Sequence, residues 1–405
     1  MTYLDEASGA PPSEAVRRAA AAALEAFGDP LQLHAHGRAA RRLLERSREE
    51  VAAAIGAQPD EVVFTSGGTE SVSLAIRGAA LARRDRGRRV VTSAVEHPAA
   101  LGAAAALEAE GFEVVRVPVD EHARVDPDRF AAEVRRPGTV LASLQHANHE
   151  VGTIQPVAEA ARLCGEAGVL FHADACQTVG RIPVDVEALG CDLASLSGRK
   201  FGAPPGVGAL FVRRGVALEA HGDERERRRR PGAPNLPGIA AMAVALREAL
   251  SDLPDQAARQ WRLTDRLRGG LAGVPGVRVH GHPTQRVPHL VGFSVAGLDP
   301  EALMLALDDR GFEIGAAVAS GSPAEPSPVL AAIGLPGTPG FRVGIGRSTP
   351  DDAIDELLRV LPGVVAELRR VDDVSSSALA RFRRAGPGGE PTPARGSRPP
   401  GWGPS

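Results

Sequence analysis

The sequence predicts an α/β protein in which a mostly parallel sheet, covered by helices, is followed by a smaller α+β unit. Short β-rich runs alternate with longer stretches of helical spacing through the first 250 residues, a pattern typical of parallel sheets with helices on both faces. From about residue 255 the alternation stops and strands and helices follow in another order. Apolar residues make up 43% of the 405-residue chain, which is enough for a large core.

The first part of the chain contains seven segments that we expect to be strands. They span residues 61–65, 89–94, 112–119, 139–145, 168–174, 191–197 and 208–214. Helical spacing fills most of the gaps, for example at residues 156–168. Ligands of such sheets bind beyond the carboxyl ends of the strands, so residues that directly follow these segments are the candidates for a site.

The second part predicts strands at 277–281, 290–297 and 341–347, with helices at 300–311 and 351–370. These elements suggest four regions, with the N-terminal segment completing the smaller unit. The expected regions are an N-terminal segment 1–15, a large domain 16–254, a small domain 255–370 and a disordered tail 371–405. The tail is rich in Ser, Gly, Pro and Arg and cannot bury enough apolar surface to order itself.

Composition narrows the class of protein. The net charge of -3 creates no general attraction to nucleic acid or to a membrane surface. There is neither an apolar run of about 18 residues nor a basic, then apolar, secretory signal at the N-terminus. The three cysteines, Cys164, Cys176 and Cys191, form no CxxC pair and no disulfide framework. We therefore expect a cytoplasmic protein.

Lys200 is the only lysine among 47 basic residues. A base-composition bias accounts for the arginines, but a guanidinium cannot serve as an amine nucleophile, so the retained lysine suggests amine chemistry. A chance survivor is the alternative. Lys200 follows the strand 191–197 and precedes the Gly/Pro-rich residues 203–208, which places it at a strand's carboxyl end. A partly desolvated, cation-rich loop would lower its pKa from about 10.4 and make the amine useful.

Two further features lie at the same predicted edge. Asp174 ends an apolar strand, where a carboxylate is costly to bury unless a cation meets it. A pyridinium nitrogen would be such a partner, and a helix N-cap is the alternative role. Residues 65–70, TSGGTE, join a strand to a helix, where backbone N–H groups could cradle a phosphate. The alternative there is a plain tight turn.

His97 and Arg342 complete the candidates. His97 follows the strand 89–94 and is either structural or part of the site. Arg342 lies inside an apolar strand and needs an anionic partner, which a substrate carboxylate or a structural Asp would supply.

In combination, these motifs resemble the fold-type I pyridoxal-phosphate (PLP) enzymes of aminotransferase class V, specifically the NifS/IscS-type cysteine desulfurases. The resemblance runs from Tyr3 to Arg342. The family's SGATES, TEH, NNEIG, DAxQ and SGHK appear here as SGGTES at 66–71, VEH at 95–97, NHEVG at 148–152, DACQ at 174–177 and SGRK at 197–200.

The resemblance implies a role for each residue. Lys200 would hold PLP as a Schiff base and abstract the α-proton of the substrate, Asp174 would pair with the pyridine nitrogen, and His97 would stack on the ring and shuttle protons. The remaining cofactor contacts and the grip on the substrate carboxylate would come from Gln177 (phenolic oxygen), Gly68, Thr69 and Ser197 (phosphate), His149 and Arg199 (cofactor binding), and Arg342 (carboxylate). The resemblance also implies a small amino acid as substrate, a homodimer and a sulfur-acceptor protein.

The chain departs from the family pattern at four places. The family's sulfur-accepting cysteine lies in a loop that here spans residues 315–327 and contains no cysteine, and Ser320 cannot carry sulfur. His149 replaces an asparagine, and Arg199 replaces a histidine but can still hold a phosphate. Ala233 replaces a phosphate-binding threonine, a loss that the arginines at 227–230 would offset unless they form a solvated loop. Cys176, beside Asp174, is the one other thiol near the expected site.

The sequence therefore predicts a cysteine desulfurase-like PLP enzyme that cleaves C–S bonds or transfers sulfur. Because the loop cysteine is missing, a PLP-dependent β-elimination lyase or an aminotransferase without persulfide chemistry is one alternative. A degenerate PLP-fold protein with no catalytic activity is the other.

Overall fold

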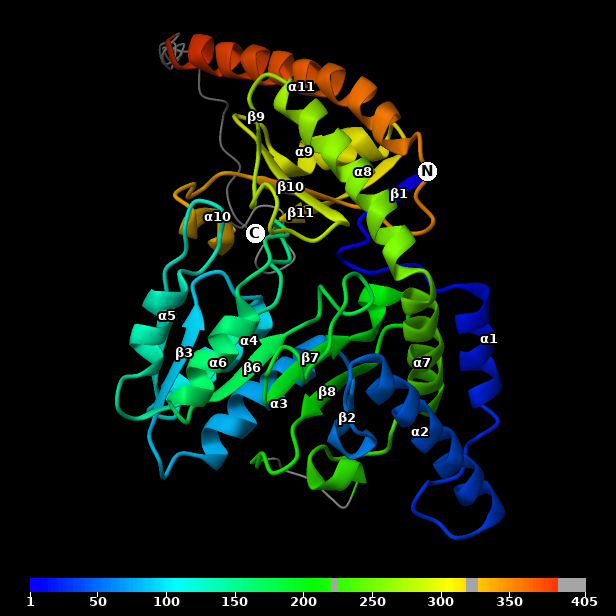
Figure 1. Cartoon of the computed structure of the whole chain (residues 1–405). Helices are drawn as coiled ribbons and strands as arrows, with labels where there is room; N and C mark the ends of the chain where they lie inside the picture. The colour runs from blue at the N-terminus through cyan, green and yellow to red at the C-terminus, as the bar shows by residue number, and fades with distance from the viewer. Residues whose placement is uncertain (220–224, 318–326, 385–405) are drawn as a thin grey trace, which may run out of the picture.

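The computed structural model describes residues 1–219, 225–317 and 327–384, which form two β-sheets flanked by helices (Figure 1). The larger sheet has seven strands in the order β2-β8-β7-β6-β5-β3-β4. Its strands are β2 Val62–Thr65, β3 Arg89–Ser93, β4 Glu113–Val117, β5 Thr139–Gln145, β6 Leu170–Asp174, β7 Leu193–Ser197 and β8 Gly208–Val212. Only β8 runs antiparallel to its neighbours, so the predicted mostly parallel α/β sheet is confirmed.

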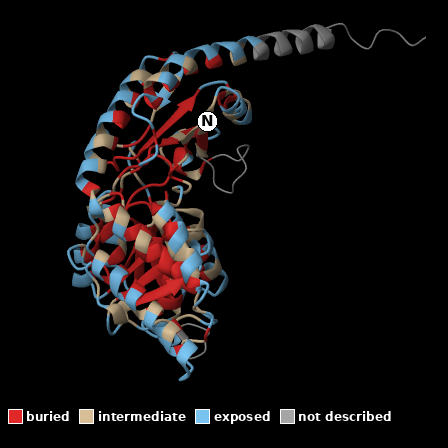
Figure 2. Cartoon of the chain, turned by 90° about the vertical axis from the view of Figure 1, so that its right-hand side faces the viewer, coloured by how far each residue is buried: buried red, intermediate tan, exposed pale blue. Residues whose placement is uncertain are grey.

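Helices cover both faces of this sheet. They are α1 Glu14–Ala23, α2 Ala35–Ala54, α3 Gly68–Ala82, α4 Pro98–Ala109, α5 Pro127–Val134, α6 Val157–Glu166 and α7 Leu236–Ser251. Alternate residues of β2 show the two faces, because Val62 and Phe64 belong to one buried cluster and Val63 to another. The buried residues, red in Figure 2, follow the sheets and are enclosed by the helices.

The smaller sheet has five strands in the order β1-β11-β12-β10-β9. The elements of this part are β1 Thr2–Leu4, β9 Val277–Val279, β10 Leu290–Val295, β11 Phe312–Ala317 and β12 Gly340–Gly344, with helices α8 Leu253–Ala272, α9 Pro300–Asp308, α10 Pro328–Ala332 and α11 Ala353–Arg384. β1 pairs in parallel with β11, which brings the N-terminus into this sheet. The sheet has its own buried cluster, separate from those of the larger sheet. We propose that the two sheets mark the two domains predicted above.

Two details differ from the sequence predictions. β11 was not predicted, because its glycine and alanines lack the apolar alternation of a strand. The tail boundary predicted at 371 is too early, because α11 continues to Arg384. Apolar residues at 371, 374, 379 and 382 extend the helical spacing into the predicted tail. Residues 385–405 of that tail lie outside the described residues. Within the described part of the chain, no helix is long and apolar enough to cross a membrane.

Candidate active site

A cavity of about 350 Å³ opens where the carboxyl ends of β5, β6 and β7 meet the N-terminal ends of α3 and α4. This is the edge at which α/β sheets bind ligands. The cavity brings together all of the predicted site residues except Arg342. Those that line it are Gly68, Thr69, His97, His149, Asp174, Gln177, Ser197, Arg199 and Lys200.

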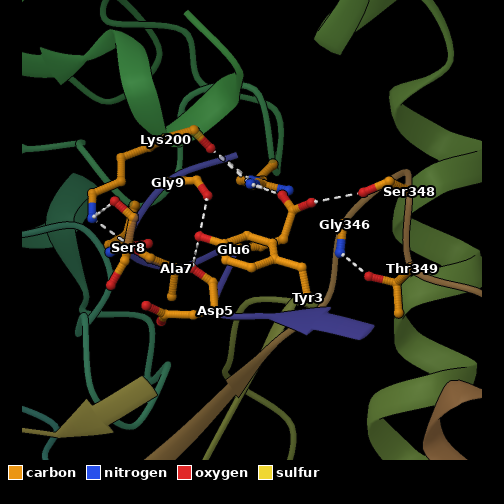
Figure 3. A network of polar contacts seen from close by, with 12 residues as sticks. Tyr3, Asp5, Glu6, Ala7, Ser8, Gly9, Lys200, Gly346, Ser348 and Thr349 are labelled. Atoms are coloured by element: carbon orange, nitrogen blue, oxygen red, sulfur yellow. Dashed lines mark hydrogen bonds and ion pairs between the residues drawn. The ribbon is translucent and has the colours of Figure 1, made fainter. Parts of the chain in front are cut away.

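Lys200 lies in a 3₁₀ turn, Gly198–Phe201, that directly follows β7. Its Nζ donates hydrogen bonds to the carbonyl oxygens of Ala7 at 2.5 Å and Ser8 at 3.1 Å (Figure 3). Burial of the amine, with the positive charges of Arg342 and Arg199, lowers the pKa of Lys200 to about 7. The site therefore holds an amine that is about half uncharged at pH 7.

A buried ion pair fixes the backbone of Lys200. Arg181 Nη2 donates to the Lys200 carbonyl oxygen at 2.7 Å and lies 3.0 Å from Glu6 Oε2. Both of these charged side chains are buried. Ser348 Oγ extends the network to Glu6 from the loop after β12 (Figure 3). Sequence reasoning missed Glu6 and Arg181, since neither belongs to a motif that carries chemistry.

Asp174 is the last residue of β6, and Gln177 lies in the turn that follows it. Asp174 is 6% exposed, and its Oδ1 accepts a hydrogen bond from the backbone N–H of Cys176 at 3.0 Å. Residues 176–181 form turns and no helix begins after Asp174, so this contact closes a turn and the helix N-cap considered for Asp174 is absent, while the residue also lines the cavity. Gln177 Nε2 donates to the Ala7 carbonyl oxygen at 3.0 Å, the same oxygen that Lys200 contacts.

The glycine loop approaches the strand ends very closely. A Cβ atom placed on Gly68, the first residue of α3, would lie 2.7 Å from Cys176 Sγ and 3.0 Å from Ser197 Cβ. Gly68 and Thr69, the first residues of a 15-residue helix, line the cavity, and the N–H groups of a helix N-terminus favour an anion. Glu70 in this turn is neutralised by Arg230, with Nε and Oε1 2.9 Å apart.

His97 is the N-cap of α4, and its Nδ1 accepts a hydrogen bond from Ala99 N–H at 3.1 Å. The proton of the neutral ring is therefore on Nε2. Burial lowers the pKa of His97, although the charge of Asp174 opposes this shift. The ring of His149 meets it edge to face, with centroids 4.9 Å apart.

Arg342 lies behind the cavity wall rather than in it. Its Nη1 donates to the His149 carbonyl oxygen at 3.1 Å, and its Nε and Nη2 each lie 3.3 Å from Asp5 Oδ1. Ser8 Oγ also accepts from Nη2. Of the two anionic partners considered for Arg342, the structure contains the structural carboxylate.

The positions at which the sequence departs from the family pattern lie in different surroundings. Arg199 lines the cavity, whereas Ala233 is exposed and does not. The arginine run is only partly solvated, because Arg229 and Arg230 are half-buried. Glu226, just before the run, pairs with the buried Arg48, with two N–O distances of 2.9 Å. Residues 318–326 of the cysteine-free loop lie outside the described residues.

None of the three thiols is arranged as a nucleophile. Cys164 and Cys191 are buried in the core, and burial raises the pKa of each to about 12. Cys176 lines the cavity, but burial and the nearby Asp174 raise its pKa well above the usual value. A persulfide-forming cysteine needs the thiolate, which these environments disfavour. The described residues contain no cluster of three or more metal-ligating side chains, His34 and His36 included.

Two buried acids beside the cavity were also missed. Glu96 accepts hydrogen bonds from Gln145 N–H at 3.0 and 3.2 Å, and burial raises its pKa to about 8. Glu150 bonds to Ser327 Oγ at 2.5 Å, and burial raises its pKa to about 7. Both acids directly neighbour a histidine in the sequence, which was the available signal.

Comparisons with known proteins agree with this arrangement. The sequence model of the aminotransferase class-V family matches residues 2–357. A cysteine desulfurase IscS of Methanosarcina thermophila is 38% identical over 357 residues, 87% of this chain and 88% of that protein. One of Dictyoglomus turgidum is 39% identical over 377 residues, 91% of this chain and 95% of that protein.

Solved structures show the same likeness. A NifS-like protein, 30% identical, superposes with a TM-score of 0.84 over 91% of this chain and 100% of its own. DndA from Streptomyces lividans, 36% identical, superposes with a TM-score of 0.71 over 85% of this chain and 99% of its own. The chain therefore belongs to the aminotransferase class-V family, as a homologue of cysteine desulfurases.

Proposed function

We propose that the protein is a PLP-dependent enzyme that cleaves the C–S bond of cysteine or a related small amino acid. The observation that carries the proposal is the chain's single lysine, whose amine is desolvated in the cavity with a pKa of about 7. An amine in this state can bond an aldehyde covalently near neutral pH. Homology with cysteine desulfurases supplies the class of substrate.

The residues present fit PLP. Gly68 lacks the Cβ that would fill the approach to Ser197, so the first turn of α3 is open to a phosphate group. Arg199 adds a cation on the cavity wall. Asp174, at the end of β6, offers a carboxylate to a pyridinium nitrogen, and Gln177 offers an amide to a phenolic oxygen. Each chemical group of the cofactor thus has a complementary partner.

When bound, PLP supplies an electron sink for the charge that develops at the substrate's α-carbon. Lys200 would accept the α-proton at Nζ, since a pKa of about 7 leaves about half of its amine uncharged at neutral pH. His97 holds a proton at Nε2 that it could give to a leaving sulfur, because its Nδ1 is occupied by Ala99 N–H. Arg342 would orient the substrate carboxylate by exchanging part of its contact with Asp5.

The test is the product formed from cysteine. Purified protein reconstituted with PLP is incubated with cysteine and a reductant, and sulfide, alanine, pyruvate and keto acids are quantified. Sulfide release that is absent in Lys200→Ala supports C–S cleavage at this site. A keto acid without sulfide would show an aminotransferase instead, and failure to bind PLP would show a non-catalytic PLP-fold protein.

We propose β-elimination as the more specific reaction, and the three thiol environments favour it. Desulfuration transfers sulfur to a protein thiolate, whereas β-elimination yields pyruvate, ammonia and sulfide without one. Burial raises the pKa of Cys164, Cys176 and Cys191, so none is ready to accept sulfur. Pyruvate in equal amount to sulfide is expected. Alanine in equal amount to sulfide would refute β-elimination and show ordinary desulfuration instead.

We propose a homodimer with sites close to its interface. Four large apolar side chains, between α1 and the start of α2, are exposed, with Phe27 at 75% and Leu33 at 79%. Such a patch is unusual on a monomer's surface. Light scattering after size exclusion tests the dimer, and Phe27→Ser should weaken it. The free cysteines support the proposed cytoplasmic location, and a sulfur-acceptor protein is proposed only if alanine is the product.

A further inference from the structure

His149 and Glu150 form an unusual pair in the cavity wall. Both ring nitrogens of His149 are buried without a hydrogen-bond partner, although the residue lines the cavity. Glu150 is 0% exposed, and its Oε1 also lacks a partner. Buried polar atoms without partners are uncommon in folded proteins and need an explanation.

The two unpartnered groups face each other. His149 Nε2 lies 3.6 Å from Glu150 Oε1, so a side-chain adjustment of about 0.6 Å would make a hydrogen bond. The backbone of the pair is held firmly. Asn148 Oδ1 accepts from the N–H groups of Glu150 and Val151, both at 2.9 Å, and Arg342 Nη1 donates to the His149 carbonyl oxygen.

We propose that Glu150 sets which ring nitrogen of His149 carries the proton, and so decides whether the other ring nitrogen, Nδ1, is a donor or an acceptor. A protonated Glu150 donates to Nε2, which leaves the proton on Nδ1. An ionised Glu150 accepts from Nε2–H, which leaves Nδ1 as an acceptor. The asparagine that the family pattern has at this position offers both an N–H donor and a carbonyl acceptor, whatever the pH.

The surroundings of the pair place the change of the His149 tautomer near neutral pH. Burial raises the pKa of Glu150 to about 7, while the Ser327 hydrogen bond and the charge of Arg342 oppose the rise. Burial lowers the pKa of His149 well below its usual value, and the charge of Arg342, with those of His97 and Lys200 when they are protonated, lowers it further. The His149 ring therefore stays neutral while Glu150 titrates, and a neutral ring is what a change of tautomer requires.

The test uses the cofactor-free protein, so it does not depend on the proposed function. Histidine labelled with ¹⁵N is incorporated, and the His149 signals are assigned by their loss in His149→Asn. The expected result is that the proton of His149 moves from Nδ1 to Nε2 with a midpoint near pH 7, and that Glu150→Gln abolishes this transition. A single His149 tautomer from pH 5.5 to 8.5 in the unsubstituted protein would overturn the proposal, as would an unchanged transition in Glu150→Gln.

A second variant guards against misfolding of Glu150→Gln. Ser327→Ala removes a hydrogen bond that favours ionised Glu150, so the midpoint should rise. A midpoint that stays in place or falls would contradict the assignment to Glu150. Visible absorbance of added PLP, recorded on the same samples, reports cofactor binding separately. Loss of that binding with an intact transition would refute the proposed function and leave this inference standing.

Discussion

The lowered pKa of Lys200 can be measured directly, because the chain has no other lysine. The method is reductive methylation with formaldehyde and a mild borohydride, followed by mass spectrometry of the peptide that contains Lys200. Because formaldehyde carries no phosphate group, its reaction with Lys200 does not depend on the phosphate binding proposed for Arg199. The N-terminal amine, methylated in the same sample, is the internal reference.

The structure sets the expected magnitude. With a pKa of about 7, roughly three quarters of the Lys200 amine is uncharged at pH 7.5, against about one part in a thousand at the ordinary value of 10.5. Labelling of Lys200 should therefore rise with a midpoint near pH 7 and level off by about pH 8. Burial is the largest cause of the shift, and the charges of Arg342 and Arg199 follow.

The perturbation is Arg199→Gln, which removes one of these charges. The midpoint should rise by on the order of one pH unit, since nearby charges shift a pKa by about that much. Arg162→Gln, on the exposed face of α6, is the matched control and should leave the midpoint unchanged. A midpoint near pH 10 in the unsubstituted protein would refute the reasoning, and so would an Arg199→Gln variant that titrates like the control.

Three further changes have expected outcomes. Gly68→Ala should weaken PLP binding about tenfold or more in an absorbance titration, because its Cβ would collide with neighbouring side chains, whereas Gly165→Ala has open space and should not. Glu226→Gln should lower the free energy of unfolding in urea by about 3 kcal/mol, since it leaves the buried Arg48 with only the more exposed Glu45, 3.5 Å away, as a charge partner. The pKa of Glu96 is raised from 4.5 to about 8, so its stabilising contribution is complete below pH 4.5 and is lost as the pH rises to 8. Glu96→Gln should reduce the pH dependence of the free energy of unfolding in urea between pH 4.5 and 8, by up to about 1.4 kcal/mol per pH unit. An unchanged pH dependence would contradict the raised pKa of Glu96.

The sequence was most informative where side-chain pattern decides structure. The predicted strand at 139–145 coincides with β5, because a mostly apolar run of this short length between polar flanks favours a buried strand over a helix. Lys200, Asp174 and His97 line one cavity because each lies at or shortly after the carboxyl end of a strand of the larger sheet. Placing them needed only the rule that ligands bind at the carboxyl ends of strands.

What could not be predicted depends on backbone groups and on pairs distant in sequence. The carbonyl oxygens of Ala7 and Ser8 bind the Lys200 amine, yet any residue type carries such an oxygen. Asp5 occupies the guanidinium of Arg342 from 337 positions away, and sequence alone left the substrate and the structural acid as equal candidates. The close approach of Gly315 in β11 to Asp5, where a Cβ would collide with the carboxylate, likewise joins residues far apart in the sequence.

The pairing of β1 with β11 also determines when the site can be completed during synthesis. The carbonyl groups that hold Lys200 are synthesised long before the strand that anchors their segment, which begins at Phe312. At typical translation rates the N-terminus waits on the order of tens of seconds for that strand. The larger sheet, whose last strand ends at Val212, can form during this interval with an exposed cavity. Closure around the lysine is thus among the last events of folding.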